Sequence, residues 1–336
     1  MSRQTNRRPI ILDRSGGFTI GGRTISSPVS SNLTLSCDHG YMEYFLPQTP
    51  RKLSLVMWHS SSTQTFQNRW DGGEGFKDMF LRRDYPVYLW DGPRVGRANW
   101  ACEPDSYTPW YRDEGNFVAW NFGPSYRNWW LDVQFPTEDG YAWQQATSAR
   151  YVEYDSDDNV QLHSNAAAIA ADSGKIGQDI AYITNSASGV RALMTVVKSN
   201  TTNIKAIICY EGYGYVFPEG ANFTANTPFF SGGGFGPYVV PLDDFKKLAK
   251  LAAVMFYWSD HRDESYLFLK QSREVAELIN LYGGNAHVMK LGEDAGLKGS
   301  THIAFADMDN DKVAMLLDGF LHKNKLDEYQ VPKWLN

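Results

Sequence analysis

The strongest constraint on the fold is the alternation of short apolar runs with helical patterns along most of the chain. Apolar runs of strand length occur at residues 53–58, 87–90, 180–183, 204–210, 252–258 and 286–291. Helical patterns occur at residues 74–83, 187–198, 242–251, 263–282 and 309–322. Strands that alternate with helices are typical of βαβ units, which build parallel sheets. We therefore expect an α/β fold with a mostly parallel central sheet flanked by helices.

Composition excludes several classes of function. The chain has 336 residues and a formal net charge of −6, without the basic block that a nucleic-acid binder carries. No run of 18 or more apolar residues occurs, so we expect no membrane span. No His-Glu-x-x-His or Cys-x-x-Cys pattern is present, and we expect no cofactor and no metal.

Residues 97–172 interrupt the alternation of strands and helices. This segment holds six of the 11 tryptophans, at positions 100, 110, 120, 129, 130 and 143, and no apolar run of strand length. It either buries its aromatic residues in a small core of its own or covers the carboxyl edge of the sheet, where α/β folds bind ligands. We expect an aromatic-rich lid, with residues 1–96 and 173–336 forming the core and 97–172 forming the cap.

The segment Thr184–Gly189 is the best candidate for a nucleophile. It follows a predicted strand and precedes a predicted helix, which is the setting of a nucleophile elbow. There the hydroxyl of Ser186 would lie at a helix N-terminus, where backbone N–H groups favour a developing oxyanion. The usual pattern is Gly-x-Ser-x-Gly, and Thr184 and Ser188 replace its two glycines.

A base and an acid follow Ser186 in the order that this kind of site requires. His302 lies between the last predicted strand and the last predicted helix, where a loop can bring an imidazole to the sheet edge. Glu211 ends one predicted strand and Asp260 ends the next, so both carboxylates are candidates for the acid. The order along the chain, serine before acid before histidine, matches that of α/β hydrolases.

Beyond these single motifs, the chain resembles a family of bacterial and fungal α/β-hydrolase esterases that begin with a β-hairpin. The resemblance extends over nearly the whole chain. The matching segments are Gly17–Gly22, His59–Ser62, Phe76–Arg83, Asp91–Arg97, Glu211, Phe217–Gly220 and Gly296–His302. The resemblance implies the α/β-hydrolase fold and serine esterase activity, and it favours Glu211 over Asp260 as the acid.

The resemblance also implies an oxyanion hole, with one important departure. Backbone N–H groups of Ala187 and of Ser61, or alternatively Ser62, would bind the oxyanion. The family has His-Gly-Gly-Gly where this chain has His59-Ser-Ser-Ser. Serine keeps the N–H groups but disfavours positive φ, so we expect a reshaped acyl site, an added hydroxyl donor or a loss of activity.

The sequence therefore predicts hydrolysis of a carboxylic ester or lactone by Ser186, His302 and Glu211 through an acyl-enzyme. The alternatives are amide cleavage, acyl transfer or a lyase step by the same triad, and a catalytically silent binding protein. The expected partner is a hydrophobic or aromatic small molecule, with Trp129, Trp130 and Phe217 as candidate contacts, and a homodimer is left open.

The N-terminus and the cysteines bear on the compartment. The apolar run near the N-terminus has only three residues, Ile10–Leu12, which is too short for a secretory signal. The cytoplasm is therefore the default expectation, with secretion as the alternative. Cys37 and Cys102 could pair in an oxidising compartment, whereas Cys209 lies in an apolar run and is expected in the core.

Overall fold

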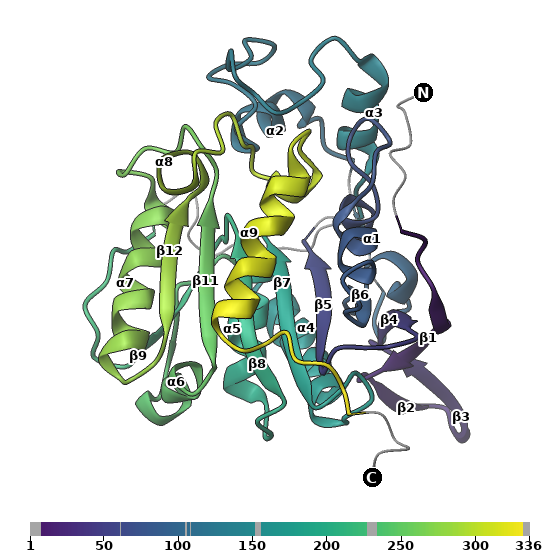
Figure 1. The fold of residues 1–336 in the computed structure, drawn as a ribbon. Helices are drawn as coiled ribbons and strands as arrows, with labels where there is room; N and C mark the ends of the chain where they lie inside the picture. The colour runs from purple at the N-terminus through teal and green to yellow at the C-terminus, as the bar shows by residue number, and fades with distance from the viewer. Residues whose placement is uncertain are drawn as a thin grey trace.

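The computed structural model describes residues 8–60, 62–104, 106–107, 109–151, 156–226 and 234–331. In this part of the chain, eight strands form a central sheet in the order β1-β4-β6-β5-β7-β8-β11-β12 (Figure 1). The strands are β1 (Leu12–Ile20), β4 (Gly40–Pro47), β5 (Leu53–His59), β6 (Val87–Asp91), β7 (Asp179–Asn185), β8 (Ile204–Tyr210), β11 (Ala253–Trp258) and β12 (Ala286–Lys290).

The sheet is mostly parallel, which confirms the prediction from the sequence. β4 pairs antiparallel with both β1 and β6, and every pairing from β6 to β12 is parallel. Helices cover both faces of the central strands, so β5 is buried along its whole length and reads as a continuous apolar run. The carboxyl ends of the parallel strands meet at one edge, where α/β sheets bind their ligands.

Two helical layers enclose the sheet (Figure 1). One layer contains α1 (Phe76–Leu81) and α9 (Asn310–Lys323), and the other contains α4 (Asp157–Asp172), α5 (Ser188–Lys198), α6 (Leu242–Ala249) and α7 (Leu267–Leu281). The remaining helices are η1 (Thr63–Phe66), η2 (Gly96–Ala98), α2 (Asp113–Ala119), α3 (Gly140–Ser148), α8 (Leu291–Ala295) and η3 (Ala304–Ala306). In α9, for example, Val313, Leu317 and Leu321 recur every four residues and are buried against the sheet.

The segment 97–172 has two structurally different parts. α2 and α3 lie beyond the carboxyl ends of the strands, at the top of Figure 1. Aromatic rings of α2 and of the chain that follows it pack together, with centroids 4.5 Å apart for Phe117 and Trp129 and 4.7 Å apart for Phe122 and Phe135. α4, by contrast, belongs to the core cluster on the α5 face of the sheet. That residues 97–172 form a cap therefore stays a prediction. Among the described residues of this segment, α2 and α3 lie over the carboxyl edge of the sheet, whereas α4 packs in the core.

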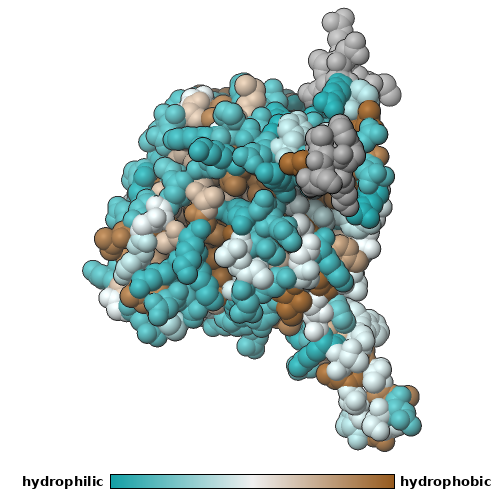
Figure 2. Space-filling view, turned by 60° about the horizontal axis from the view of Figure 1, so that its bottom comes forward, coloured by the Kyte–Doolittle hydropathy of each residue, from teal (hydrophilic) through white to brown (hydrophobic). Residues whose placement is uncertain are grey.

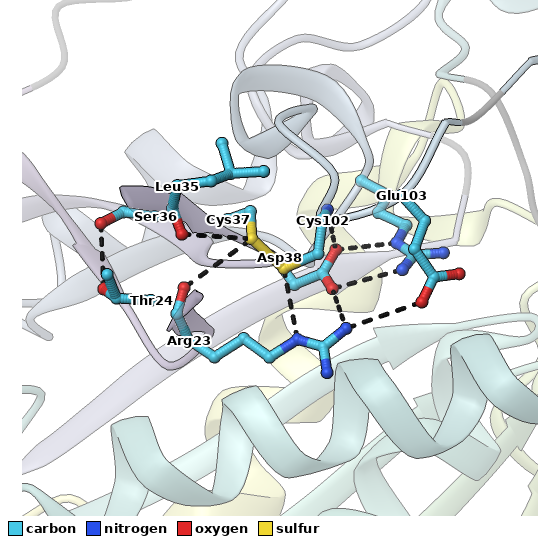
Figure 3. The surroundings of a disulfide bond; sticks show 9 residues. Arg23, Thr24, Leu35, Ser36, Cys37, Asp38, Cys102 and Glu103 are labelled. Carbon is cyan, nitrogen blue, oxygen red and sulfur yellow. Dashed lines mark hydrogen bonds and ion pairs between the residues drawn. A yellow bond between two sulfur atoms is a disulfide. The ribbon is translucent and has the colours of Figure 1, made fainter. Parts of the chain in front are cut away.

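A hairpin and a disulfide bond extend the N-terminal part of the molecule. β2 (Arg23–Ser27) pairs antiparallel with β3 (Ser30–Cys37), and Figure 2 shows this hairpin as a projecting arm that carries hydrophobic residues among polar ones. Cys37 at the end of β3 forms a disulfide with Cys102 (Figure 3). The neighbouring carboxylate of Asp38 accepts hydrogen bonds from Arg94 Nε (2.8 Å) and from the backbone N–H of Cys102 (3.3 Å).

Two short strands complete the structure beside α5 and α6. β9 (Val216–Pro218) pairs parallel with β10 (Tyr238–Val240). Cys209 is buried in the core, as its apolar neighbours in the sequence indicate. None of the helices within the described ranges combines the length and the apolar character needed to cross a membrane.

Candidate active site

Ser186 occupies a strained turn between β7 and α5. Its φ is 56°, a left-handed conformation that residues with a side chain rarely adopt. Three backbone hydrogen bonds hold the turn. The N–H of Ser186 donates to the carbonyl of Tyr210 (3.1 Å), and its own carbonyl accepts from Gly189 (2.9 Å) and Tyr213 (3.1 Å). The surrounding backbone therefore fixes the conformation that a nucleophile elbow requires.

The residues that replace the usual glycines are accommodated by buried hydrogen bonds. Thr184 donates through Oγ1 to the carbonyl of Ile208 (3.3 Å), and the Ser188 hydroxyl donates to the carbonyl of Trp58 (2.6 Å). The close approach occurs one residue later, where a Cβ on Gly189 would lie 2.5 Å from Cys209 Sγ. The elbow thus needs glycine at position 189 rather than at 188.

His302 and Glu211 form a buried pair beside this turn. Nδ1 of His302 lies 2.7 Å from Oε2 of Glu211, and the two side chains are 2% and 1% exposed. The backbone of His302 is held on both sides, because its N–H donates to the carbonyl of Trp120 (2.9 Å) and its carbonyl accepts from Asn185 Nδ2 (2.8 Å). His302 and Ser186 line the same cavity, which has a volume of about 130 Å³.

Glu211 also pairs with an arginine that the sequence did not reveal. Arg262 donates from Nε to Oε1 (2.9 Å) and from Nη2 to Oε2 (2.6 Å), while the N–H and the hydroxyl of Ser259 also donate to Oε1. Burial by itself raises the pKa of Glu211, but Arg262 and His302 outweigh it and hold that pKa far below its usual range. Glu211 is therefore an anion with a fixed orientation.

Asp260, the other candidate acid, contacts the loop that carries His302. Its Oδ2 accepts from the N–H of Gly299 (2.9 Å), and its own N–H donates to Ser300 Oγ (2.8 Å). The structure thus brings Glu211 to the imidazole and places Asp260 against residues 299 and 300. Asp307 supports the same loop, because its carboxylate accepts from the N–H (2.6 Å) and the hydroxyl (2.7 Å) of Thr301.

The candidate oxyanion donors are only partly described. Ser61 lies outside the described residues. The N–H of Ser62, the alternative donor, instead donates to Nδ1 of the His59 ring (3.1 Å). Burial lowers the pKa of His59 well below its ordinary value, and the nearby His302 and Arg150 lower it further, so the ring is neutral. Ala187 precedes α5 and lines the cavity.

The cavity wall consists mainly of residues without a sequence motif. Its described lining residues are His59, Ser60, Arg112, Asn116, Ala119, Trp120, Arg150, Ser186, Ala187, Tyr213, Phe235 and His302. None of the three aromatic residues expected to touch a substrate is among these described lining residues, and their role stays a prediction. Trp129 packs against Phe135 (centroids 5.3 Å apart), Trp130 stacks on His261 (4.4 Å) and Phe217 stacks on Phe223 (4.2 Å).

One group of potential metal ligands lies close together within the described ranges. His261 Nε2 is 2.7 Å from Asp132 Oδ1 and 3.7 Å from Asp260 Oδ2. These contacts join the end of β11 to the segment between α2 and α3. Because Asp260 already accepts the N–H of Gly299, the group has a structural explanation, and we assign no ion to it.

No family model matches the chain, and no curated protein matches it in sequence. Among solved structures, it is similar to a novel bacterial esterase determined at atomic resolution, with a TM-score of 0.73 and 22% identity over 96% of this chain and 99% of that one. Thermogutta terrifontis Est2 (TM-score 0.45, 13% identity, 93% and 95% covered) and Pyrococcus horikoshii acylaminoacyl peptidase (0.44, 12%, 96% and 43%) are too distant to carry an argument. The strand order of the sheet, the turn at Ser186 between β7 and α5, and the similarity to the bacterial esterase together show that this chain has the α/β-hydrolase fold.

Proposed function

We propose that the chain is a serine hydrolase that cleaves a carboxylic ester or lactone. One observation carries the proposal. Ser186, held at φ 56°, shares a cavity with His302, whose Nδ1 contacts a buried and ionised Glu211. A base that is oriented by a carboxylate and shares a cavity with a serine hydroxyl is the arrangement that activates a serine nucleophile. The bacterial esterase, to which 96% of this chain is similar in structure, supports the same activity.

The proposed reaction proceeds in two steps through an acyl-enzyme. Ser186 Oγ attacks the carbonyl carbon while Nε2 of His302 takes its proton, and Glu211 stabilises the imidazolium through Nδ1. The tetrahedral intermediate collapses, and the leaving alcohol takes the proton from His302. Water then gives a proton to His302 and attacks the acyl carbon. The second tetrahedral intermediate collapses, and His302 returns the proton to Ser186 Oγ as the acid leaves.

The oxyanion of both intermediates needs backbone donors. We assign one to the N–H of Ala187, which stands at the start of α5, where the helix dipole also favours negative charge. The second is assigned to Ser61, which follows β5 in the sequence and lies outside the described residues. Because the N–H of Ser62 is directed at His59, Ser61 is favoured over Ser62 for this role.

The compartment belongs to the proposal as well. Disulfides persist in oxidising compartments and are rare in the cytosol. The bond between Cys37 and Cys102 therefore supports a secreted or otherwise oxidising location over the cytoplasm that the sequence alone favours.

Hydrolysis of a panel of p-nitrophenyl esters and lactones tests the proposed activity. We expect turnover by the wild type and a loss of about 10⁴-fold or more in kcat for Ser186→Ala. The thermal midpoint of each protein controls for folding. A folded wild type that hydrolyses no member of the panel would favour the catalytically silent alternative, and activity that survives Ser186→Ala would exclude Ser186 as the nucleophile.

A further inference from the structure

A second cavity lies between helix α3 and the chain that follows η1. It has a volume of about 210 Å³, and residues of the segment 64–72 line one side of it, whereas Tyr141 and Gln145 of α3 line the other. None of its described lining residues belongs to the cavity of Ser186 and His302. The candidate triad therefore does not account for this cavity.

Hydrogen bonds fix the loop side of the cavity. The guanidinium of Arg69 donates from Nε and Nη2 to the two carboxylate oxygens of Asp71 (2.7 Å each) and from Nη1 to the carbonyl of Met308 (3.0 Å). The backbone N–H of Trp70, the next residue, donates to the carbonyl of Ala306 (3.3 Å). These bonds attach the loop to η3 and to the chain after it. A ligand would therefore meet a wall that needs little reorganisation on binding.

Packing fixes the helix side of the cavity. Ala142 and Ala146 of α3 are buried in the same hydrophobic cluster as Trp70. Tyr141 and Gln145 each precede one of these alanines, and they lie one helical turn apart on one face. Small side chains thus anchor α3, while a phenol ring and a carboxamide of the same helix line the cavity.

The lining of the cavity is polar, but its charge is already paired. Arg69 is the one charged residue among the described lining residues, and its ion pair with Asp71 compensates that charge. An anionic ligand would have to compete with the Asp71 carboxylate for the guanidinium, so it would gain little from binding here. The lining therefore favours a neutral ligand.

Carboxamides supply most of the polar groups. Gln64, Asn68 and Gln145 each offer two N–H donors and a carbonyl acceptor. A hydroxyl group likewise both donates and accepts hydrogen bonds, so a ligand with several hydroxyl groups complements such a lining. The rings of Trp70 and Tyr141 belong to the same lining and add apolar surface against which C–H groups can pack.

The indole of Trp70 adds a donor that needs an acceptor. Trp70 is 3% exposed, and its Nε1 has no hydrogen-bond partner within the described residues. A buried donor without an acceptor costs free energy, so such a group calls for an explanation. An occupant of the cavity that carries hydroxyl groups can supply the acceptor.

We propose that this cavity binds one neutral sugar ring, either as a free monosaccharide or as a unit of a longer carbohydrate. A sugar ring has several hydroxyl groups, apolar C–H groups and no charge, which are the three properties that the lining favours. A cavity of about 150 Å³ admits benzene, so about 210 Å³ is sufficient for a six-membered ring with substituents. Because the cavity is separate from that of Ser186, the proposal does not depend on the hydrolase activity.

A titration with matched sugars, monitored by NMR of the ligand, tests the proposal. The neutral probes are D-glucose, D-galactose and D-mannose, and the charged probe is sodium D-glucuronate, which has a carboxylate where glucose has a hydroxymethyl group. At least one neutral sugar should bind saturably to one site per chain with a Kd of about 1 mM or tighter. Glucuronate should bind no more tightly than glucose, because Arg69 is already paired.

Two disaccharides distinguish the two sources of the sugar ring. Tighter binding of cellobiose or maltose than of glucose would support a longer carbohydrate as the ligand. Equal or weaker binding of both would support a free monosaccharide.

Three variants place the binding in this cavity. Gln145→Ala removes a lining carboxamide, and Trp70→Phe removes the indole N–H but keeps an aromatic ring beside Phe135. Each should weaken the Kd by about three- to tenfold. Gln144→Ala is the matched control, because Gln144 is the exposed neighbour of Gln145 and is not among the described lining residues. It should leave the Kd unchanged, and the thermal midpoint of each variant controls for folding.

Three results would overturn the proposal. They are a lack of saturable binding by every neutral sugar, tighter binding of glucuronate than of glucose, and binding that neither Gln145→Ala nor Trp70→Phe weakens. None of these results bears on Ser186, because the titration measures binding without turnover. Conversely, a chain that hydrolyses no ester could still bind the sugar as proposed.

Discussion

At the scale of single residues, Glu211 links the candidate base to a buried arginine. It contacts His302 on one side and Arg262 on the other, and its pKa is held far below its usual range. The sequence allowed Glu211 to be placed at a strand end, because chain order and the resemblance both pointed there. Arg262 was missed, since a single arginine after a strand has no pattern that distinguishes it from a surface residue.

Substitution of the two candidate acids should separate their roles. We expect Glu211→Gln to lower kcat by about 10²–10⁴-fold, because the imidazolium loses its anionic partner. Asp260→Asn should cost less, since Asp260 bonds to the Gly299 N–H rather than to the imidazole. Steady-state kinetics on the best ester of the panel measures both. A larger loss for Asp260→Asn would show that Asp260 is the acid.

Arg262 should matter for stability, because it is 9% exposed and neutralises a buried carboxylate. Removing one partner of a buried ion pair costs about 3–5 kcal/mol, so Arg262→Met should lower the free energy of unfolding by that amount. Arg273 offers a matched control. It pairs with Glu264 at 2.8 Å on the surface, and Arg273→Met should cost less than about 1 kcal/mol. Equal losses in urea denaturation would contradict this interpretation of Arg262.

At the scale of elements, the loop between α8 and η3 depends on one close approach. Gly296 and Gly299 both have φ near +69°, so alanine at either position meets the same backbone strain. A Cβ on Gly299 would lie 1.7 Å from the carbonyl oxygen of Asp132, whereas nothing lies within 4 Å of a Cβ on Gly296. Gly299 thus allows the chain before α3 to pack against the loop of His302.

This pair of glycines gives a prediction with an internal control. Gly299→Ala should separate the loop from Asp132 and displace His302, and a shift of about 1 Å in such a group can cost about 10²-fold in kcat/KM. Gly296→Ala should lose stability of about 1–2 kcal/mol from backbone strain but keep most of its activity. Ester hydrolysis and urea denaturation of both variants provide the test. Similar kcat/KM values for the two variants would show that the contact with Asp132 does not position His302.

The predictability of the elements follows from their local patterns. The parallel strands could be predicted because each is a short apolar run, and the helices at 187–198 and 309–322 because their apolar residues recur at helical spacing. The role of α4 could not be predicted. An alanine-rich helix has the same pattern whether it packs on a sheet or within a cap, and only the position of α5 next to it distinguishes the two. Likewise, no local pattern directs Arg112 and Arg150 to the cavity.

At the scale of the whole molecule, the Cys37–Cys102 disulfide connects the projecting hairpin to the chain that follows β6. The bond closes a loop with a sequence separation of 65, and removing a native disulfide typically costs about 2–5 kcal/mol of stability. The sequence left this pairing open, because two cysteines do not reveal whether their Cα atoms come together. In the structure those atoms are 5.0 Å apart.

The disulfide can be tested on the intact protein. A reducing agent should lower the free energy of unfolding of the wild type by about 2–5 kcal/mol in urea denaturation. The double variant Cys37→Ser/Cys102→Ser should show the lower stability from the start and no response to the reducing agent. Cys209, which is buried and free, serves as the internal thiol control. A reductant effect that persists in the double variant would contradict this account of the bond.

The central claim concerns Ser186, and covalent labelling tests it most directly. A fluorophosphonate reacts with a serine that a neighbouring histidine activates, and it does so whatever the natural substrate is. Peptide mapping by mass spectrometry after labelling then identifies the modified residue. We predict one label per chain, on Ser186, and none in a folded Ser186→Ala variant. A folded wild type that takes up no label, or takes it up at another residue, would contradict the assignment of Ser186 as the nucleophile.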